Sequence, residues 1–165
     1  MPKKIQITTF GAGLFYLYNY ADSVKELIHV FKLDKDKSVA KLFRESLELE
    51  LFSDYDLVIP VPCHWFRVIS RGFFHLKELF GSVPGYQGGL VKRVRYTGVL
   101  YKKGRKEREK TMKDVFSVTD PSAIQGKSIL IVDDIFTTGT TYKEIKKELE
   151  KYSPAKVEGL FLCRA

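Results

Sequence analysis

The run Ile129 to Val132 consists of four consecutive aliphatic residues, and Asp133 and Asp134 follow it at once. A short apolar run with polar residues on both sides is typical of a strand that is buried on both faces of a parallel sheet. A second run of this kind, Asp56 to Val61, ends at Pro62. The chain is therefore expected to form a sheet whose buried strands are connected by helices.

Helical periodicity around these two runs supports an α/β fold. Helices are predicted from Ser23 to about Lys32, from Ser38 to Leu47 and from Thr140 onward, because apolar residues recur at helical spacing behind residues that cap helices. The same spacing marks Trp65 to Phe80, and Val157 to Leu162 is predicted as the last strand. This alternation indicates a parallel sheet with right-handed crossovers.

The 165 residues are expected to form a single domain with two parts. Residues 1–52 are predicted as a small hood made of a hairpin, with strands Ile5 to Thr9 and Leu14 to Tyr20, and the first two helices. Residues 53–165 form the α/β core. Leu90 to Arg95 and Val115 to Val118 are predicted strands on either side of a mobile basic loop, at about 97–114.

The net charge of +8 is concentrated in that basic segment. Between Lys92 and Lys113 there are ten Lys or Arg residues against Glu107 and Glu109, a local excess of 8, so the rest of the chain sums to zero. Such a segment is either a solvated loop or a patch that meets a polyanion.

Composition excludes several other classes of protein. No apolar run approaches the roughly 20 residues of a membrane helix, and the first ten residues lack the apolar core of a signal peptide, so a cytoplasmic protein is expected. Cys63 and Cys163 are too few for a disulfide framework or a cysteine-based zinc site.

The segment after Val132 predicts a site for a sugar phosphate. Asp133 and Asp134 are expected at the carboxyl edge of the sheet, and the loop Thr137 to Thr141 leads into a helix whose first N–H groups can bind a phosphate. Ribose 5-phosphate has this shape, since its hydroxyls would donate to the two acids, which could also help to hold Mg²⁺.

Three other structures are compatible in part with this segment. A P-loop is excluded because Thr140, not lysine, follows Gly139, and a response-regulator receiver domain is excluded because too few residues remain after Asp134. An ordinary buried strand followed by a capped helix stays open until the geometry is known.

The stretch ILIVDDIFTTGTT, Ile129 to Thr141, resembles the phosphoribosyl-pyrophosphate (PRPP) motif of type I phosphoribosyltransferases. With IPVPCHWFRVISRGF (59–73) and VKRVRYTGVLYKKGRKEREKTMKDVFSV (91–118), it is similar in order and spacing to the ComF-type phosphoribosyltransferases, the family named for bacterial competence. The similarity begins at about Tyr20, and the zinc ribbon that many relatives carry in front is not recognised before it.

This resemblance implies a type I phosphoribosyltransferase-like fold and transfer of ribose 5-phosphate from PRPP to an unknown nitrogenous acceptor, with release of pyrophosphate and with Mg²⁺ as cofactor. The residues that it places at the PRPP site are Asp133, Asp134, Thr137, Thr138, Gly139, Thr140 and Thr141. Asp133 and Asp134 would hold the metal and act in catalysis together with Arg105 and Arg108 of the basic loop, and Pro62, Cys63, His64 and Arg67 would form the pyrophosphate loop.

Departures from the family pattern leave the acceptor open. Phe74 and His75 stand where the family usually has Asn and Gln, Leu100 and Thr111 replace amide residues of the basic loop, and Thr137 provides no carboxylate base. An alternative function is a binding protein that keeps the fold and contacts single-stranded DNA through the basic loop during DNA uptake. A homodimer is also left open.

Overall fold

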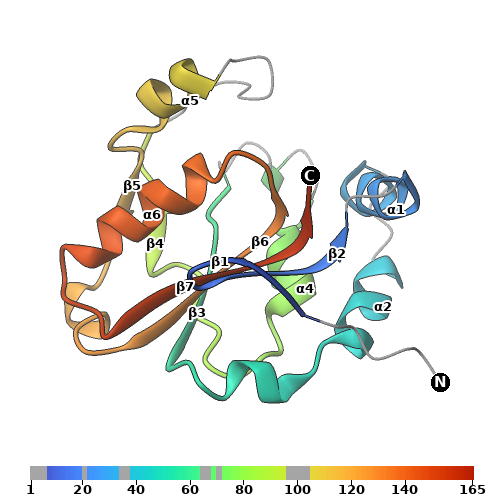
Figure 1. Cartoon of the computed structure of the whole chain (residues 1–165), viewed down its shortest axis with the longest axis horizontal. Coiled ribbons are helices and arrows are strands. Elements are labelled where there is room, and N and C mark those ends of the chain that lie inside the picture. The colour runs from blue at the N-terminus through green and yellow to red at the C-terminus, as the bar shows by residue number, and fades with distance from the viewer. Residues whose placement is uncertain (1–6, 20–21, 34–37, 64–67, 70–71, 96–104) are drawn as a thin grey trace.

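The computed structural model describes residues 7–19, 22–33, 38–63, 68–69, 72–95 and 105–165. Within these residues the main sheet has five strands in the order β1-β2-β7-β6-β3 (Figure 1). The strands of this sheet are β1 Thr8–Gly11, β2 Leu14–Asn19, β3 Leu57–Pro60, β6 Ser128–Phe136 and β7 Lys156–Arg164. A separate antiparallel pair is formed by β4 Val91–Arg93 and β5 Phe116–Val118. The helical segments are α1 Asp22–Leu33, α2 Ser38–Ser46, η1 Leu49–Phe52, α4 His75–Phe80, α5 Arg105–Met112, η3 Pro121–Ala123 and α6 Thr140–Glu150.

Strand β6 lies at the centre of the parallel part of the sheet. It pairs with β3 on one side and with β7 on the other, and both pairs are parallel. Residues 129–132 are fully buried, as the apolar run predicts. The strand extends four residues beyond this run, to Phe136, so that the two aspartates belong to the strand itself.

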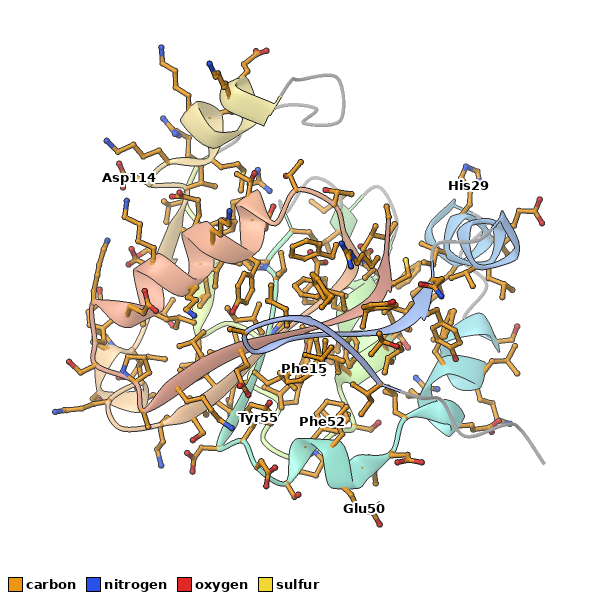
Figure 2. The ribbon with its side chains drawn as sticks, in the orientation of Figure 1. Phe15, His29, Glu50, Phe52, Tyr55 and Asp114 are labelled. Atoms are coloured by element: carbon orange, nitrogen blue, oxygen red, sulfur yellow. The ribbon has the colours of Figure 1, made fainter. Side chains whose placement is uncertain are left out.

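Helices cover both faces of the sheet. On one face, α6 comes close because Gly159 has no side chain: a Cβ there would lie 2.7 Å from the ring of Tyr142. On the other face, α4 contributes Leu76, Leu79 and Phe80, which are essentially inaccessible to water. Phe52 is equally buried, and Figure 2 shows it pointing from η1 toward the sheet while His29 points outward from α1.

The amino-terminal hairpin is continuous with the main sheet, which the division into hood and core did not predict. Strand β2 pairs in parallel with β7, with Phe15 opposite Leu160 and Tyr18 opposite Cys163. The backbone of β2 therefore pairs with the edge of β7, which would otherwise expose unpaired backbone groups. The division of the chain at residue 52 stays a prediction.

Two predicted elements differ from the structure. Helical spacing from Trp65 to Phe80 suggested one helix, but α4 begins only at His75, and Gly72 has a φ of 80°, which no α-helical residue adopts. The basic loop is helical over α5. Its straight-chain Arg, Lys and Glu residues lose little side-chain freedom in a helix, and the Thr111 hydroxyl donates to the Glu107 carbonyl one turn back at 2.7 Å.

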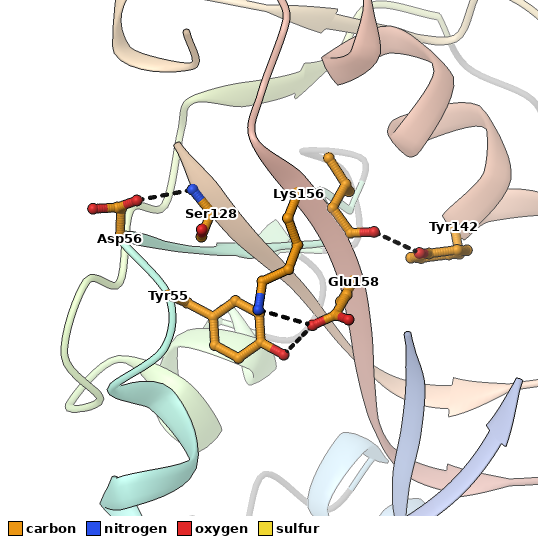
Figure 3. A network of polar contacts seen from close by, with 7 residues as sticks. Tyr55, Asp56, Ser128, Tyr142, Lys156 and Glu158 are labelled. Atoms are coloured by element: carbon orange, nitrogen blue, oxygen red, sulfur yellow. Dashed lines mark hydrogen bonds and ion pairs between the residues drawn. The ribbon is translucent and has the colours of Figure 1, made fainter. Parts of the chain in front are cut away.

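The amino ends of the strands are closed by a polar network (Figure 3). The hydroxyl of Tyr55 donates to Oε2 of Glu158 at 2.5 Å, and Nζ of Lys156 lies 3.4 Å from the same oxygen. Beside them, the N–H of Ser128 donates to the carboxylate of Asp56 at 2.8 Å. These polar groups use their hydrogen-bonding capacity on one another. A ligand site is therefore expected at the opposite, carboxyl edge of the sheet.

Candidate functional site

Asp133 and Asp134 project from opposite faces of the sheet, because successive side chains of a strand alternate. Asp133 lies on the α6 face and borders a small pocket together with the threonine loop, residues 137–141. Asp134 lies on the α4 face, where it meets His75. The two neighbouring acids therefore have different surroundings.

Asp134 and His75 form a buried polar pair. Nε2 of His75 lies 2.8 Å from Oδ2 of Asp134, and their side chains are only 7% and 10% exposed. His75 is the first residue of α4, and its ring packs edge-on against the ring of Phe74. Because burying a charged group is costly without a polar partner, this contact holds the Asp134 carboxylate in place.

Asp133 is oriented by its own backbone. Its Oδ1 accepts a hydrogen bond from the N–H of Asp134 at 2.9 Å, and the residue is only partly buried. The side chain thus stays at the carboxyl edge, on the side of the threonine loop. A carboxylate in that position can accept hydrogen bonds from the hydroxyls of a bound sugar.

The threonine loop has the geometry of a phosphate cradle. Gly139 has a φ of 72° and immediately precedes α6, and a Cβ on it would lie 2.7 Å from Cζ of Phe136. The hydroxyls of Thr138 and Thr140 lie 2.9 Å apart. Glycine is required here because only a residue without a side chain fits both the left-handed backbone and the close approach.

The backbone N–H groups of the loop are available. In the described part of the chain, those of Thr138, Gly139 and Thr141 donate to no protein acceptor, and that of Thr140 makes only a long contact of 3.5 Å to the Thr138 hydroxyl. The small pocket here has a volume of about 40 Å³. Amides that have no acceptor among the described residues, at the positive end of the α6 dipole, favour an anion.

Tyr142 forms one wall of the same small pocket. Its hydroxyl donates to the carbonyl of Val157 at 3.4 Å, and burial, followed by the negative charges of Glu158 and Glu150, raises the pKa of Tyr142 to about 12. The phenol is therefore neutral at physiological pH and adds no negative charge beside the loop.

The end of β3 brings part of the predicted pyrophosphate loop to the same edge of the sheet. Pro60 is the register partner of Val132, and the N–H of Val61 donates to the Val132 carbonyl at 2.9 Å. Pro62 and Cys63 follow directly and are partly buried. His64 and Arg67 lie outside the described residues, and so does Arg71.

The basic segment begins and ends at the β4-β5 pair. The guanidinium of Arg95 donates to the carbonyls of Thr111 and Lys113 at 3.1 and 2.7 Å, which ties the two ends of the segment together. Arg105 and Arg108 belong to α5, but their side chains, like residues 96–104, lie outside the described part. Their predicted catalytic role stays a prediction.

A metal ion held jointly by Asp133 and Asp134 is not built into this arrangement, since the two carboxylates face opposite sides of the sheet. The described residues contain no group of three or more His, Cys, Asp or Glu side chains that could hold a metal. Mg²⁺ commonly binds through one carboxylate together with substrate phosphates and water. Asp133 is the acid that fits this mode.

Sequence reasoning did not assign a partner to His75. The resemblance to the ComF family implies glutamine at position 75, but only the fold shows that the histidine there faces Asp134. The available signal was that the substituted residue retains an N–H donor.

No described helix is both long and apolar enough to cross a membrane.

Comparison with known proteins agrees with this geometry. The model of the phosphoribosyl transferase domain family matches residues 68–165. The chain is 30% identical over 161 residues to the competence protein ComFC of Streptococcus pneumoniae, covering 93% of this chain and 70% of that protein. It is 28% identical over 159 residues to the DNA utilization protein YhgH of Escherichia coli K12, covering 88% and 69%. A hypoxanthine-guanine phosphoribosyltransferase structure from Bacillus anthracis shares the fold, with a TM-score of 0.51 at 16% identity over 78% of this chain and 70% of that one.

Proposed function

Because this chain belongs to the ComF-type branch of the phosphoribosyltransferase family, we propose that it transfers ribose 5-phosphate from PRPP to a nitrogenous acceptor and releases pyrophosphate. One observation carries the proposal. At the junction of β6 and α6, the N–H groups of Thr138, Gly139 and Thr141 donate to no acceptor among the described residues, and they lie beside the Asp133 carboxylate. A phosphate and a ribose on one molecule match these two features together.

Each part of the site has a separate role in this proposal. The loop amides and the hydroxyls of Thr138 and Thr140 bind the 5-phosphate. Asp133 accepts hydrogen bonds from the ribose hydroxyls and keeps C1 oriented. His75 holds Asp134 in its position on the opposite face.

Charge on the leaving group has to be balanced as the bond from C1 to pyrophosphate breaks. Mg²⁺ would supply positive charge on the pyrophosphate oxygens, with Asp133 as its protein ligand. Backbone amides near Pro62 and Cys63 and the arginines Arg105 and Arg108 are the proposed protein donors. Exclusion of water protects the oxocarbenium-like centre from hydrolysis.

The proton of the acceptor is not taken by the threonine loop in this proposal. Position 137 is a threonine, so the loop contains no carboxylate base. The acceptor is therefore expected to attack through a nitrogen that is already unprotonated, or to lose its proton to another group of the substrates.

The test measures PRPP binding by calorimetry and pyrophosphate release in parallel, with Mg²⁺ and a panel of nucleobases and amines. Asp133→Asn is expected to weaken PRPP binding about tenfold, because it removes one charge-assisted contact. Asp54→Asn makes the same chemical change at an exposed position before β3 and should bind like the parent. Equal binding by all three proteins would refute the site assignment.

A second candidate function is suggested by the names of the relatives. A competence protein and a DNA utilization protein are similar over most of the chain, and the segment from Lys92 to Lys113 carries a local charge excess of 8. A cytoplasmic binding protein that contacts single-stranded DNA through this segment would fit both facts. PRPP binding without pyrophosphate release for any acceptor, with oligonucleotide binding that weakens steeply as salt rises, would favour this alternative.

A further inference from the structure

A second, much larger pocket lies beside the carboxyl end of β3. Its volume is about 760 Å³, and it is bordered by β3 and the residues that follow it, by α4 and by β4. Pro62 and Cys63 of the predicted pyrophosphate loop contribute to its wall, but no residue of the threonine loop does. Pockets of this size commonly accept small organic ligands.

The pocket is positively charged. Among the described residues, Lys77, Lys92 and Arg93 line it, and no aspartate or glutamate does. Within the described residues, the ammonium groups of Lys77 and Lys92 have no carboxylate partner. Arg93 is positioned by contacts of its guanidinium to the Arg95 carbonyl at 3.3 Å and to the sulfur of Met112 at 3.7 Å. The lining therefore favours an anionic ligand.

Much of the remaining wall is apolar and partly aromatic. Phe74 and Tyr86 contribute rings, and Val68, Ile69 and Val91 contribute aliphatic surface. Ile69 is 68% exposed and forms part of the rim of the pocket.

The backbone holds Tyr86 firmly in this wall. The Val58 N–H donates to the Gly85 carbonyl at 2.8 Å, and the Gln87 N–H donates to the Val58 carbonyl at 2.9 Å, so the segment is attached to the edge of β3. Beyond it, Gln87, Gly88 and Gly89 also border the pocket and provide amide and backbone polar groups. Such groups can read the edge of a heterocycle.

We propose that this pocket binds a nucleotide unit, with the base against the Phe74 and Tyr86 side and the phosphate between Lys77 and Lys92. A phosphate alone would leave the apolar wall exposed, and a neutral ring would leave the cations without a counterion. The site shares Pro62 and Cys63 with the proposed pyrophosphate loop, but neither PRPP binding nor phosphoribosyl transfer is needed for a nucleotide to bind in it.

The test is a calorimetric titration of the full chain with adenosine 5′-monophosphate (AMP), with adenosine and inorganic pyrophosphate as the two partial probes. AMP is expected to bind at least about tenfold more tightly than adenosine, because adenosine makes no charge-assisted contact. Since AMP also contains ribose 5-phosphate, the titration is repeated with ribose 5-phosphate at the same concentration as AMP, which should not displace AMP from this pocket because it lacks the base.

Variants locate the bound nucleotide. Lys77→Gln combined with Lys92→Gln, and separately Ile69→Glu at the exposed rim, are each expected to weaken AMP binding about tenfold or more. Lys147→Gln removes one lysine charge from the outer side of α6, away from both pockets, and should leave binding unchanged. All altered side chains are exposed, so the fold should be retained, which circular dichroism checks.

Four outcomes would overturn the proposal. The first is no binding of AMP at millimolar concentration, and the second is displacement of AMP by ribose 5-phosphate. The third is an AMP affinity that is unaltered in the Lys77, Lys92 and Ile69 variants. The fourth is pyrophosphate binding that is as tight as AMP binding and depends on the variants in the same way. A parallel titration with an eight-nucleotide oligothymidylate identifies the source of the nucleotide. Tighter binding of the strand than of thymidine monophosphate supports a strand as the ligand, and equal or weaker binding supports a free nucleotide.

Discussion

Replacing His75 by leucine is expected to lower the free energy of unfolding by more than a substitution between side chains of similar size usually does. Leucine is a good helix former and nearly fills the volume of the imidazole, so α4 and its packing should be retained. What is lost is the contact of 2.8 Å between Nε2 and Oδ2 of Asp134. The carboxylate then stays in a site where its side chain is only 10% exposed.

The expected magnitude follows from the nature of this contact. Leaving a buried carboxyl group without its polar neighbour costs about 1 to 3 kcal/mol, and more when the group is charged. The free energy of unfolding should therefore fall by about 1 to 3 kcal/mol, and for a domain of this size the melting temperature should fall by roughly 2 to 12 °C.

Urea unfolding at pH 7, followed by circular dichroism, measures the change, with His75→Gln as the matched control. Glutamine keeps an N–H donor at this position, and it is the residue that the resemblance to the ComF family implies there. His75→Gln should recover at least half of the loss. The reasoning is refuted if His75→Leu unfolds within about 0.5 kcal/mol of the parent, the range of ordinary surface substitutions, or if His75→Gln is as unstable as His75→Leu.

Further predictions concern the loop, the tyrosines and the closed edge of the sheet. Gly139→Ala should lower stability by about 1 to 3 kcal/mol and weaken PRPP binding, because its φ is 72° and the new Cβ meets a ring; unchanged calorimetric affinity would contradict the cradle. Tyr142, whose pKa is raised to about 12, should ionise well above pH 10 in a titration at 295 nm, and its contribution to stability is fully present below pH 10 and lost as the pH rises toward 12. Tyr86→Phe should be neutral or slightly stabilising in urea, since the Tyr86 hydroxyl is buried without a hydrogen-bond partner in the described residues; a loss above about 1 kcal/mol would argue against this. Tyr55→Phe should cost about 1.5 kcal/mol and should have no further effect in a Glu158→Ala background, which removes the acceptor, if the 2.5 Å contact is the cause.

The sequence predicted helices, strands and turns well where several neighbouring residues indicate the same element. The apolar run 129–132 and the glycine among the threonines determine a buried strand, a left-handed turn and a helix start within a few residues, because each depends on near neighbours along the chain. The same reasoning was wrong about the basic segment, part of which is the helix α5. There, charge suggested a loop, while the helix propensity of Arg, Lys and Glu favoured the helix.

The tertiary structure determined which strands pair and which side chains are in contact. Local spacing could not show that β2 pairs with β7 or that His75 reaches Asp134, because these contacts depend on strand order and on which face a side chain occupies. Alternation along β6 separates Asp133 from Asp134 although they are neighbours in sequence. The chain thus determined by itself which groups end β6 and begin α6, and only packing determined which of them share one side of the sheet.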